Sequence, residues 1–192
     1  ADDAVESEHL NNNIISGQTE LASAPDSTDE LLISDGGTLK RIDVSLIGGA
    51  NTPSFLVTRS GAQSISSDSA TKIQWNSEIF DTDNTFDSST NYRFTPGVAG
   101  KYVLAAGTRA SSFETSEKMQ LTFFKNGSGV SYQTQTRSFS TSSGGETITV
   151  DAQILVESDT DDYFEVYLLQ TEGGTRDIGS ASYFYGYKLI GA

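Results

Sequence analysis

Cysteine is absent from the 192-residue sequence, and histidine occurs only once, as His9. Without cysteine, the chain has no disulfides, no thiol nucleophile and no zinc site with the usual sulfur ligands. Because His9 lies in an acidic stretch ahead of any candidate domain, a Ser–His–Asp triad inside a folded domain is excluded. No GxGxxG or GxxxxGK[ST] pattern is present to bind phosphates. We therefore predict a protein that is not an enzyme, with no catalytic residues and no cofactor.

Positive charge is also scarce. Lys and Arg number 12 against 26 Asp and Glu, which gives a net charge of −14. Nucleic-acid phosphates and anionic membrane surfaces attract the opposite sign. The longest apolar runs are four or five residues, far short of the roughly 20 that a membrane-spanning helix needs. We expect a soluble protein with no nucleic-acid partner and no membrane insertion.

Aromatic residues are missing from the first part of the chain, since all 19 fall at or after Phe55. Residues 1–50 also hold ten acidic residues against only Lys40 and Arg41. Such a segment lacks the side chains that anchor a globular core. The sequence therefore predicts two parts. Residues 1–50 form an acidic N-terminal arm with a β-hairpin for attachment or assembly, and residues 51–192 form a globular head.

The hairpin is predicted from two strand-like runs, 29–34 and 38–44. They flank Asp35-Gly36-Gly37, which supplies the positive φ angles of a tight turn. An isolated hairpin is only marginally stable in water, so this one should pack on a symmetry mate or on the head. Attachment to other proteins is expected through six apolar residues of this part: Ile14, Ile15, Leu31, Ile33, Leu39 and Ile42.

Short alternating runs separated by turn residues dominate from residue 52 onward. Alternation is clearest between Ile148 and Val156, where every second residue is apolar or small, and no helical period of similar strength competes. About ten such runs predict an all-β sandwich or jelly roll. The expected strands cover residues 54–59, 71–75, 79–80, 92–95, 101–108, 118–124, 130–136, 146–156, 162–169 and 183–190.

The last of these runs is apolar or aromatic on both of its faces. Phe184 and Ile190 alternate onto one face, and the other carries Tyr183, Tyr185, Tyr187 and Leu189. One face can fill the core of the head, but the second needs a cover, because large exposed apolar patches normally mark interfaces. We therefore expect self-association.

Four segments of the head resemble the C1q and tumour-necrosis-factor-like jelly rolls. They are the corner YRFTPGVAGKY at 92–102, the strand and turn LTFFKNG at 121–127, the pair of strands at 148–157 and 161–166, and the closing strand SYFYGYKL at 182–189. The resemblance covers about residues 52–192. It implies a jelly-roll β-sandwich and a homotrimer whose inner sheets surround a threefold axis, with Tyr183, Tyr185, Tyr187 and Leu189 at the subunit interface. Which face of the closing strand turns toward the axis stays open at this point.

Residues 17–46 resemble short β elements that precede the trimeric heads of bacteriophage tail fibres and other virion appendages. This second resemblance implies a virion structural protein on the exterior of the capsid or tail. Its N-terminal arm would bind other virion proteins, and its head would form a tail-fibre or receptor-binding tip for a host-surface glycan or protein. Three alternatives remain: a capsid decoration or cement protein, a secreted C1q-like binding module, and a tail-associated glycan-degrading enzyme that uses a pair of carboxylates.

Three weaker candidate sites complete the sequence analysis. Asp81, Asp83 and Asp87 have the alternate spacing of calcium ligands, but the segment lacks the glycine and the terminal glutamate of the EF-hand loop. A solvated acidic loop is the competing interpretation. Asn126-Gly127-Ser128 matches a glycosylation acceptor, although Asn-Gly favours a hairpin turn. The arginines that are candidates for a surface that binds anionic sugars are Arg109, Arg137 and Arg176.

Overall fold

The computed structural model describes residues 28–47, 51–113, 118–138 and 146–190, together with residues 19, 21, 25 and 26. The chain divides into two compact units, Ala1–Gly49 and Ala50–Ala192. Each unit is described by itself below. In the described part of the chain, no helix has the length and apolar composition needed to cross a bilayer.

The N-terminal unit contains a two-stranded antiparallel hairpin. Strand β1 (Glu30–Asp35) pairs with β2 (Thr38–Asp43), and a short 3-10 turn over Val44–Leu46 follows. Gly36 and Gly37 both have positive φ, +58° and +82°, as a two-residue hairpin turn requires. The predicted hairpin is therefore present, with ends that differ by one residue. No side chain between residues 28 and 47 is buried.

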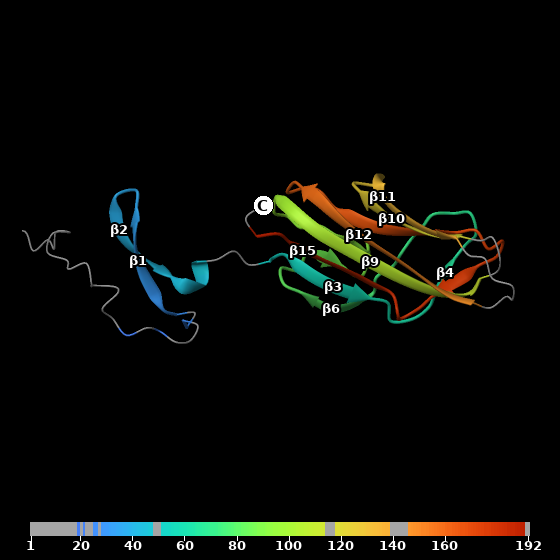
Figure 1. Cartoon of the computed structure of the whole chain (residues 1–192), viewed down its shortest axis with the longest axis horizontal. Helices are drawn as coiled ribbons and strands as arrows, with labels where there is room; N and C mark the ends of the chain where they lie inside the picture. Colours follow the sequence, from blue (N-terminus) through green and yellow to red (C-terminus); the bar gives the residue numbers. More distant parts are fainter. Residues whose placement is uncertain are drawn as a thin grey trace, which may run out of the picture. The chain divides into compact units, whose positions relative to one another are not determined.

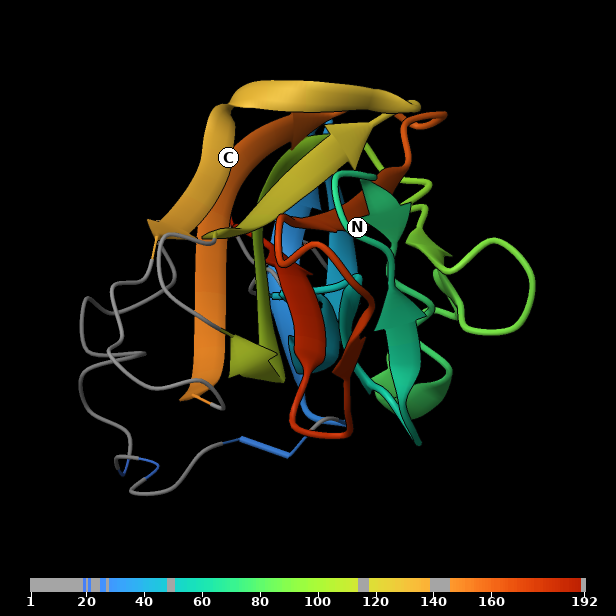
Figure 2. The ribbon, with the colours of Figure 1, turned by 90° about the vertical axis from the view of Figure 1, so that its right-hand side faces the viewer.

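The head is a sandwich of two β-sheets, which curl around a shared core (Figure 2). The larger sheet has seven strands, the smaller one six. The order in the larger sheet is β4 (Gln63–Ile65), β14 (Arg176–Ile178), β9 (Gly100–Phe113), β15 (Tyr183–Lys188), β3 (Ser54–Thr58) and β6 (Ser77–Asp81), and β12 (Glu146–Ser158) also pairs with β9. The order in the smaller sheet is β11 (Ser128–Ser138), β10 (Lys118–Lys125), β13 (Phe164–Gln170), β8 (Arg93–Phe94) and β7 (Phe86–Asp87), and β5 (Thr71–Lys72) also pairs with β13.

This architecture confirms the predicted all-β jelly roll. All ten predicted runs contain a strand, and β4, β7 and β14 are additional. The three additional strands are only two or three residues long, too short to show an alternating pattern in the sequence. In Figure 1 the strands β12, β9, β15, β3 and β6 lie side by side across the larger sheet.

The core lies between the two sheets and is filled from alternate positions of the strands. In β12 the inward residues are those predicted by alternation, from Ile148 to Val156, and all are buried. Aromatic rings form its centre: Phe184 packs against Phe55 at 4.9 Å between ring centroids and against Phe86 at 5.8 Å. Edge-to-face rings of this kind add to the stabilisation from area burial.

The final strand is shorter than predicted. It ends at Lys188, two residues before the predicted end at Ile190, and the 57% exposed Ile190 therefore does not join Phe184 on one face of the strand as its alternation predicted. The physical reason is that its neighbour β3 begins at Ser54, so β15 has no ladder partner on that side beyond Tyr187. Lys188 donates its backbone N–H to the carbonyl of Pro53 at 3.1 Å, which brings the first and last strands of the head together at one end.

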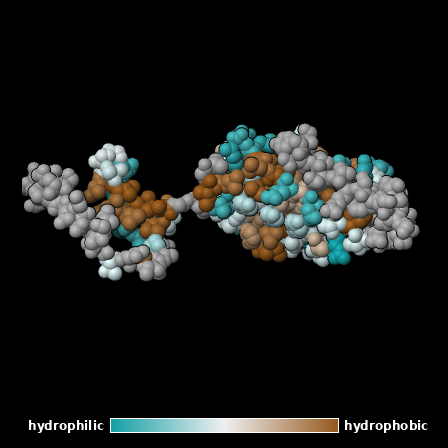
Figure 3. All heavy atoms as spheres, viewed as in Figure 1, coloured by the Kyte–Doolittle hydropathy of each residue, from teal (hydrophilic) through white to brown (hydrophobic). Residues whose placement is uncertain are grey.

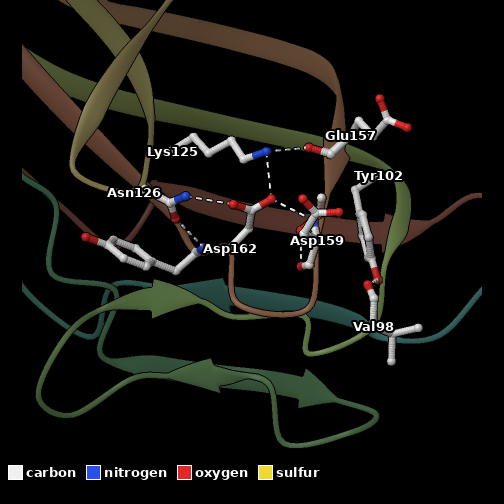
Figure 4. Close-up of polar contacts among 9 residues, drawn as sticks. Val98, Tyr102, Lys125, Asn126, Glu157, Asp159 and Asp162 are labelled. Atoms are coloured by element: carbon white, nitrogen blue, oxygen red, sulfur yellow. Dashed lines mark hydrogen bonds and ion pairs between the residues drawn. The ribbon is translucent and has the colours of Figure 1, made fainter.

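An ion pair between the half-buried Lys125 and the buried Asp162 joins the loops near that end (Figure 4). Lys125 Nζ lies 2.6 Å from Asp162 Oδ2 and donates to the Glu157 carbonyl at 2.9 Å. Asn126 Nδ2 donates to the same carboxylate at 2.7 Å, and Asp159 donates its backbone N–H at 2.6 Å. Burial alone raises the pKa of Asp162, but these hydrogen bonds and the Lys125 charge outweigh it and lower the pKa.

The Asn-Gly pair next to this ion pair forms a turn. Asn126 and Gly127 have φ of +53° and +76°, and they join β10 to β11. The structure thus confirms the hairpin interpretation of Asn126-Gly127-Ser128. The Asn126 side chain also accepts the Tyr163 backbone N–H at 3.0 Å, so both ends of its amide have partners.

Candidate functional site

The outer face of the larger sheet carries the predicted tyrosines. Tyr183, Tyr185 and Tyr187 of β15 are half-buried on this face, whereas Phe184 and Gly186 are buried on the other side of the strand. The strand's core face is therefore the Phe184 face, which leaves the tyrosine face outside. Leu189 follows the strand and is also half-buried.

Apolar residues of the neighbouring strands continue this face. Tyr185 stands opposite Leu56 of β3 and Ala105 of β9, and Leu56 in turn stands opposite Phe80 of β6. Figure 3 shows hydrophobic atoms on this face along β6 and where β9 and β12 lie side by side. Three of its large apolar side chains are strongly exposed: Ile79 at 60%, Phe80 at 47% and Leu155 at 55%. We call the residues Leu56, Ile79, Phe80, Val103, Ala105, Leu155, Tyr183, Tyr185 and Tyr187 the outer apolar face.

A glycine of β9 orders the tyrosines on this face. Tyr183 stands opposite Gly107, and its hydroxyl donates to Asp151 Oδ1 of β12 at 3.0 Å, so the phenol crosses β9. A Cβ on Gly107 would lie 2.6 Å from the Tyr183 ring, closer than real contacts allow. The Tyr183 ring also stacks on Tyr185, with ring centroids 6.0 Å apart.

The phenol of Tyr183 is accordingly held in its neutral form. Burial and the hydrogen bond to Asp151 raise the pKa of Tyr183 to about 12. The outer apolar face is thus preorganised, since two of its tyrosines have fixed neighbours before any partner binds. Sequence reasoning missed Gly107, because its role depends on the register of three strands.

The hairpin of the N-terminal unit has two exposed faces. By pairing, Leu31, Ile33 and Ile42 share one face, and Leu39 lies on the other with Leu32. The structure therefore brings together three of the six predicted attachment residues and separates Leu39 from them. Ile14 and Ile15 lie outside the described residues. A groove of about 630 Å³ adjoins the first face and is lined by Leu21, Pro25, Asp29, Glu30, Leu31, Val44 and Ile47.

The three predicted calcium ligands are engaged in loop hydrogen bonds. Asp81 accepts from the Phe86 backbone N–H at 2.7 Å, and Asp83 from the Thr82 hydroxyl at 2.7 Å. Asp87 accepts the backbone N–H groups of Thr90, Ser89 and Asn91, and these bonds hold its pKa well below the usual value. Within the described residues, no three Asp, Glu or His side chains are grouped so that they would hold a metal ion.

The three candidate arginines differ in their surroundings. Arg176 is ion-paired with Glu172, four residues before it. The side chain of Arg137 lies outside the described residues. Arg109 is exposed on β9, and its guanidinium has no hydrogen-bond or ion-pair partner within the described part of the head.

Comparison with solved structures identifies the fold. The globular domain of the zebrafish complement 1qA protein aligns with a TM-score of 0.51 and 16% identity, over 72% of this chain and 98% of that one. The Eiger TNF structure from S. frugiperda aligns with a TM-score of 0.51 and 11% identity, over 72% of this chain and 93% of that one. In comparisons of sequence, no protein family and no curated relative matches the chain. The head therefore has a C1q/TNF-like jelly-roll fold.

Proposed function

We propose that the protein is a non-enzymatic, homotrimeric binding module whose outer apolar face packs around a threefold axis. The observation that carries this proposal is the outer apolar face itself, which exposes Ile79, Phe80 and Leu155 beside ordered tyrosines. A contiguous apolar face of this kind is typical of a subunit interface. The resemblance to C1q and TNF jelly rolls supports a trimer in particular, since homotrimers are the rule in that group.

The trimer is tested by placing charge on this face. The Tyr185→Lys and Tyr187→Lys double variant should stay folded and soluble but no longer assemble, because burying two ammonium groups in an apolar interface is unfavourable. Light scattering should give three times the 20.5 kDa chain mass for the unmodified protein and one chain mass for the variant. Val98→Lys is the matched control, because Val98 is exposed in the loop before β9 and is not part of the outer apolar face. A monomeric unmodified protein rules the trimer out.

We further propose that the trimer is the outward tip of a virion appendage, a tail fibre or receptor-binding tip. In this arrangement the N-terminal unit attaches to other virion proteins and the head binds a host-surface glycan or protein. The resemblance of residues 17–46 to fibre elements supports this proposal, and so does the hairpin, because none of its apolar side chains is buried among the described residues. Three weak sites on one trimer would raise avidity without any new contact.

One observation favours the alternative of a capsid decoration protein. The hairpin exposes apolar side chains on both of its faces, Leu31 and Ile33 on one and Leu32 and Leu39 on the other. A hairpin that is apolar on both sides suits a position between two neighbouring shell subunits. Copy number on isolated particles separates the two roles, because a decoration protein is present in many more copies than a fibre. Absence of the protein from particles rejects both and leaves a secreted C1q-like module.

A further inference from the structure

A cavity of about 380 Å³ opens at one end of the head, beyond the outer apolar face. It lies where β14 replaces β15 as the neighbour of β9, at the pair Ile178 and Ala110. In Figure 1, β4 and this end of β9 lie at the end of the head away from the start of β3, and Figure 2 looks onto that end. The cavity volume falls within the range of about 300–1,000 Å³ that is typical of small-ligand sites.

The cavity combines a small apolar surface with a polar rim. The exposed apolar surface comes from Ala62 and Ala181, whereas Ala110 and Ile178 line the cavity from beneath and turn their side chains into the core. Arg109 stands on the rim without a partner in the described part of the head. The hydroxyl groups on the rim come from Ser111, Thr147 and Ser180.

A carboxylate completes the rim and is held in place by a neighbouring strand. Asp177 Oδ1 accepts a hydrogen bond of 2.6 Å from the Ser64 hydroxyl of β4, and no described residue bonds its second oxygen, which a ligand can therefore contact. One guanidinium, one carboxylate and several hydroxyls therefore surround the small apolar surface of Ala62 and Ala181. A ligand that matches this rim needs one anionic group, several hydroxyl groups and an apolar ring face.

We propose that this cavity binds a sugar that carries a carboxylate, a uronic or sialic acid residue of a surface glycan. The guanidinium of Arg109 matches a carboxylate through two parallel hydrogen bonds. Asp177 and the rim hydroxyls take the hydroxyl groups of the sugar, and the exposed Ala62 and Ala181 contact its ring. Asp177 repels a multiply charged phosphate, and none of the described lining residues is aromatic, so a nucleobase has no stacking partner. The inference rests on the proposed function, since it names the ligand class of the binding module.

The test is a calorimetric titration of the full chain with sialyllactose and digalacturonic acid, and with lactose as the neutral probe. At least one acidic probe should bind, and lactose should bind at least about tenfold more weakly, because it lacks the charged group. Arg109→Met should weaken binding of the acidic probe by about tenfold or more, and Arg109→Lys by less. Lys101→Met is the matched control, because Lys101 is also exposed on the same face of β9 at the other end. It removes the same charge and should leave binding unchanged.

Binding of neither acidic probe overturns the proposal, and so does equal binding of lactose. Binding that Arg109→Met leaves intact, or that Lys101→Met weakens equally, also overturns it. Circular dichroism of each variant checks that the head is folded. If Arg109→Met does not fold, the binding of Arg109→Lys is compared with that of the unmodified protein instead. Light scattering on the same samples tests the trimer proposal independently of the sugar-site proposal. A trimer without sugar binding rejects the sugar site alone, whereas a monomer that binds the sugar rejects the trimer alone.

Discussion

The head and the N-terminal unit differ in how far they bury their apolar side chains. The head encloses a core of aromatic and aliphatic residues from both sheets, including Phe55, Trp75 and Phe184. In residues 28–47 no side chain is buried, and Leu32, Leu39 and Leu46 are each 70% exposed or more. A hairpin without a core is only marginally stable in water. The difference teaches that the head has a core of its own to stabilise it, while the hairpin is expected to need a partner for its stability.

The largest loss of stability is expected when an aromatic ring is removed from the core of the head. Phe184→Ala should lower the free energy of unfolding by about 3–5 kcal/mol, because it leaves a cavity where Phe184 contacts Phe55 and Phe86. Denaturant unfolding measures the loss. Tyr185→Phe is the matched control on the opposite face of the same strand, and it should change the free energy of unfolding little. A Phe184→Ala head as stable as the unmodified one contradicts the assignment of the core face.

Gly107→Val is expected to lower the free energy of unfolding by a smaller amount. The new side chain occupies the space of the Tyr183 ring and should lower the free energy of unfolding by about 1–3 kcal/mol. It also separates Tyr183 from Asp151, so the pKa of Tyr183 should fall from about 12 toward the ordinary value near 10. The ultraviolet absorbance of tyrosinate, followed from pH 9 to pH 13, reports this change. An unchanged titration means that the ring does not lie over Gly107.

Local patterns in the sequence predicted what depends on one strand or one turn. Alternation identified the buried side of β12, and Asn126-Gly127 identified the turn between β10 and β11. The tyrosines of β15 were likewise predicted to share one face. Features that depend on register between distant strands escaped prediction. The bond from Tyr183 to Asp151 joins residues 32 positions apart, and its need for Gly107 follows only once β9 lies between them.

The candidate site was predictable to a similar extent. Arg109 was one of three arginines considered for anionic sugars, and nothing local in the sequence distinguished it. The folded structure supplies the distinction. The short loop before β14 brings Glu172 onto Arg176, four residues later, while Arg109 borders a cavity formed by the distant strands β9 and β14. The three aspartates proposed for calcium had suitable spacing, but spacing does not show that backbone N–H groups occupy the Asp87 carboxylate.

Acid should weaken the head through Asp162. Its pKa is lowered in the folded state, so its stabilising effect is complete above the unfolded value of about 3.9 and is lost as the pH falls through the lower folded value. Asp162→Asn should therefore cost about 1–2 kcal/mol at pH 7. The difference from the unmodified protein should shrink below pH 4. Thermal unfolding measured from pH 7 to pH 2 provides the check, and a difference that grows with acid contradicts the role given to the Lys125 pair.

The smallest effect on the stability of the head is expected from substitutions in the N-terminal hairpin. Leu31→Asp combined with Ile33→Asp should change the free energy of unfolding of the head by no more than about 0.5 kcal/mol, because neither side chain is buried. The same variant should lose attachment to its particle partner, which co-sedimentation with particles would show. Leu39→Asp, on the opposite face of the hairpin, tells whether one face or both are used. A large loss of head stability would mean that the hairpin packs on the head.

The hydrogen bond between Lys188 and Pro53 has a further consequence for the use of the head as a component. Because its first and last strands start and stop side by side, residues 53–188 can be inserted into a surface loop of another protein without stretching either junction. The cavity beside Arg109 would then point away from the carrier. Under the sugar-site proposal, the rim residues could therefore be changed without redesign of the junctions at residues 53 and 188.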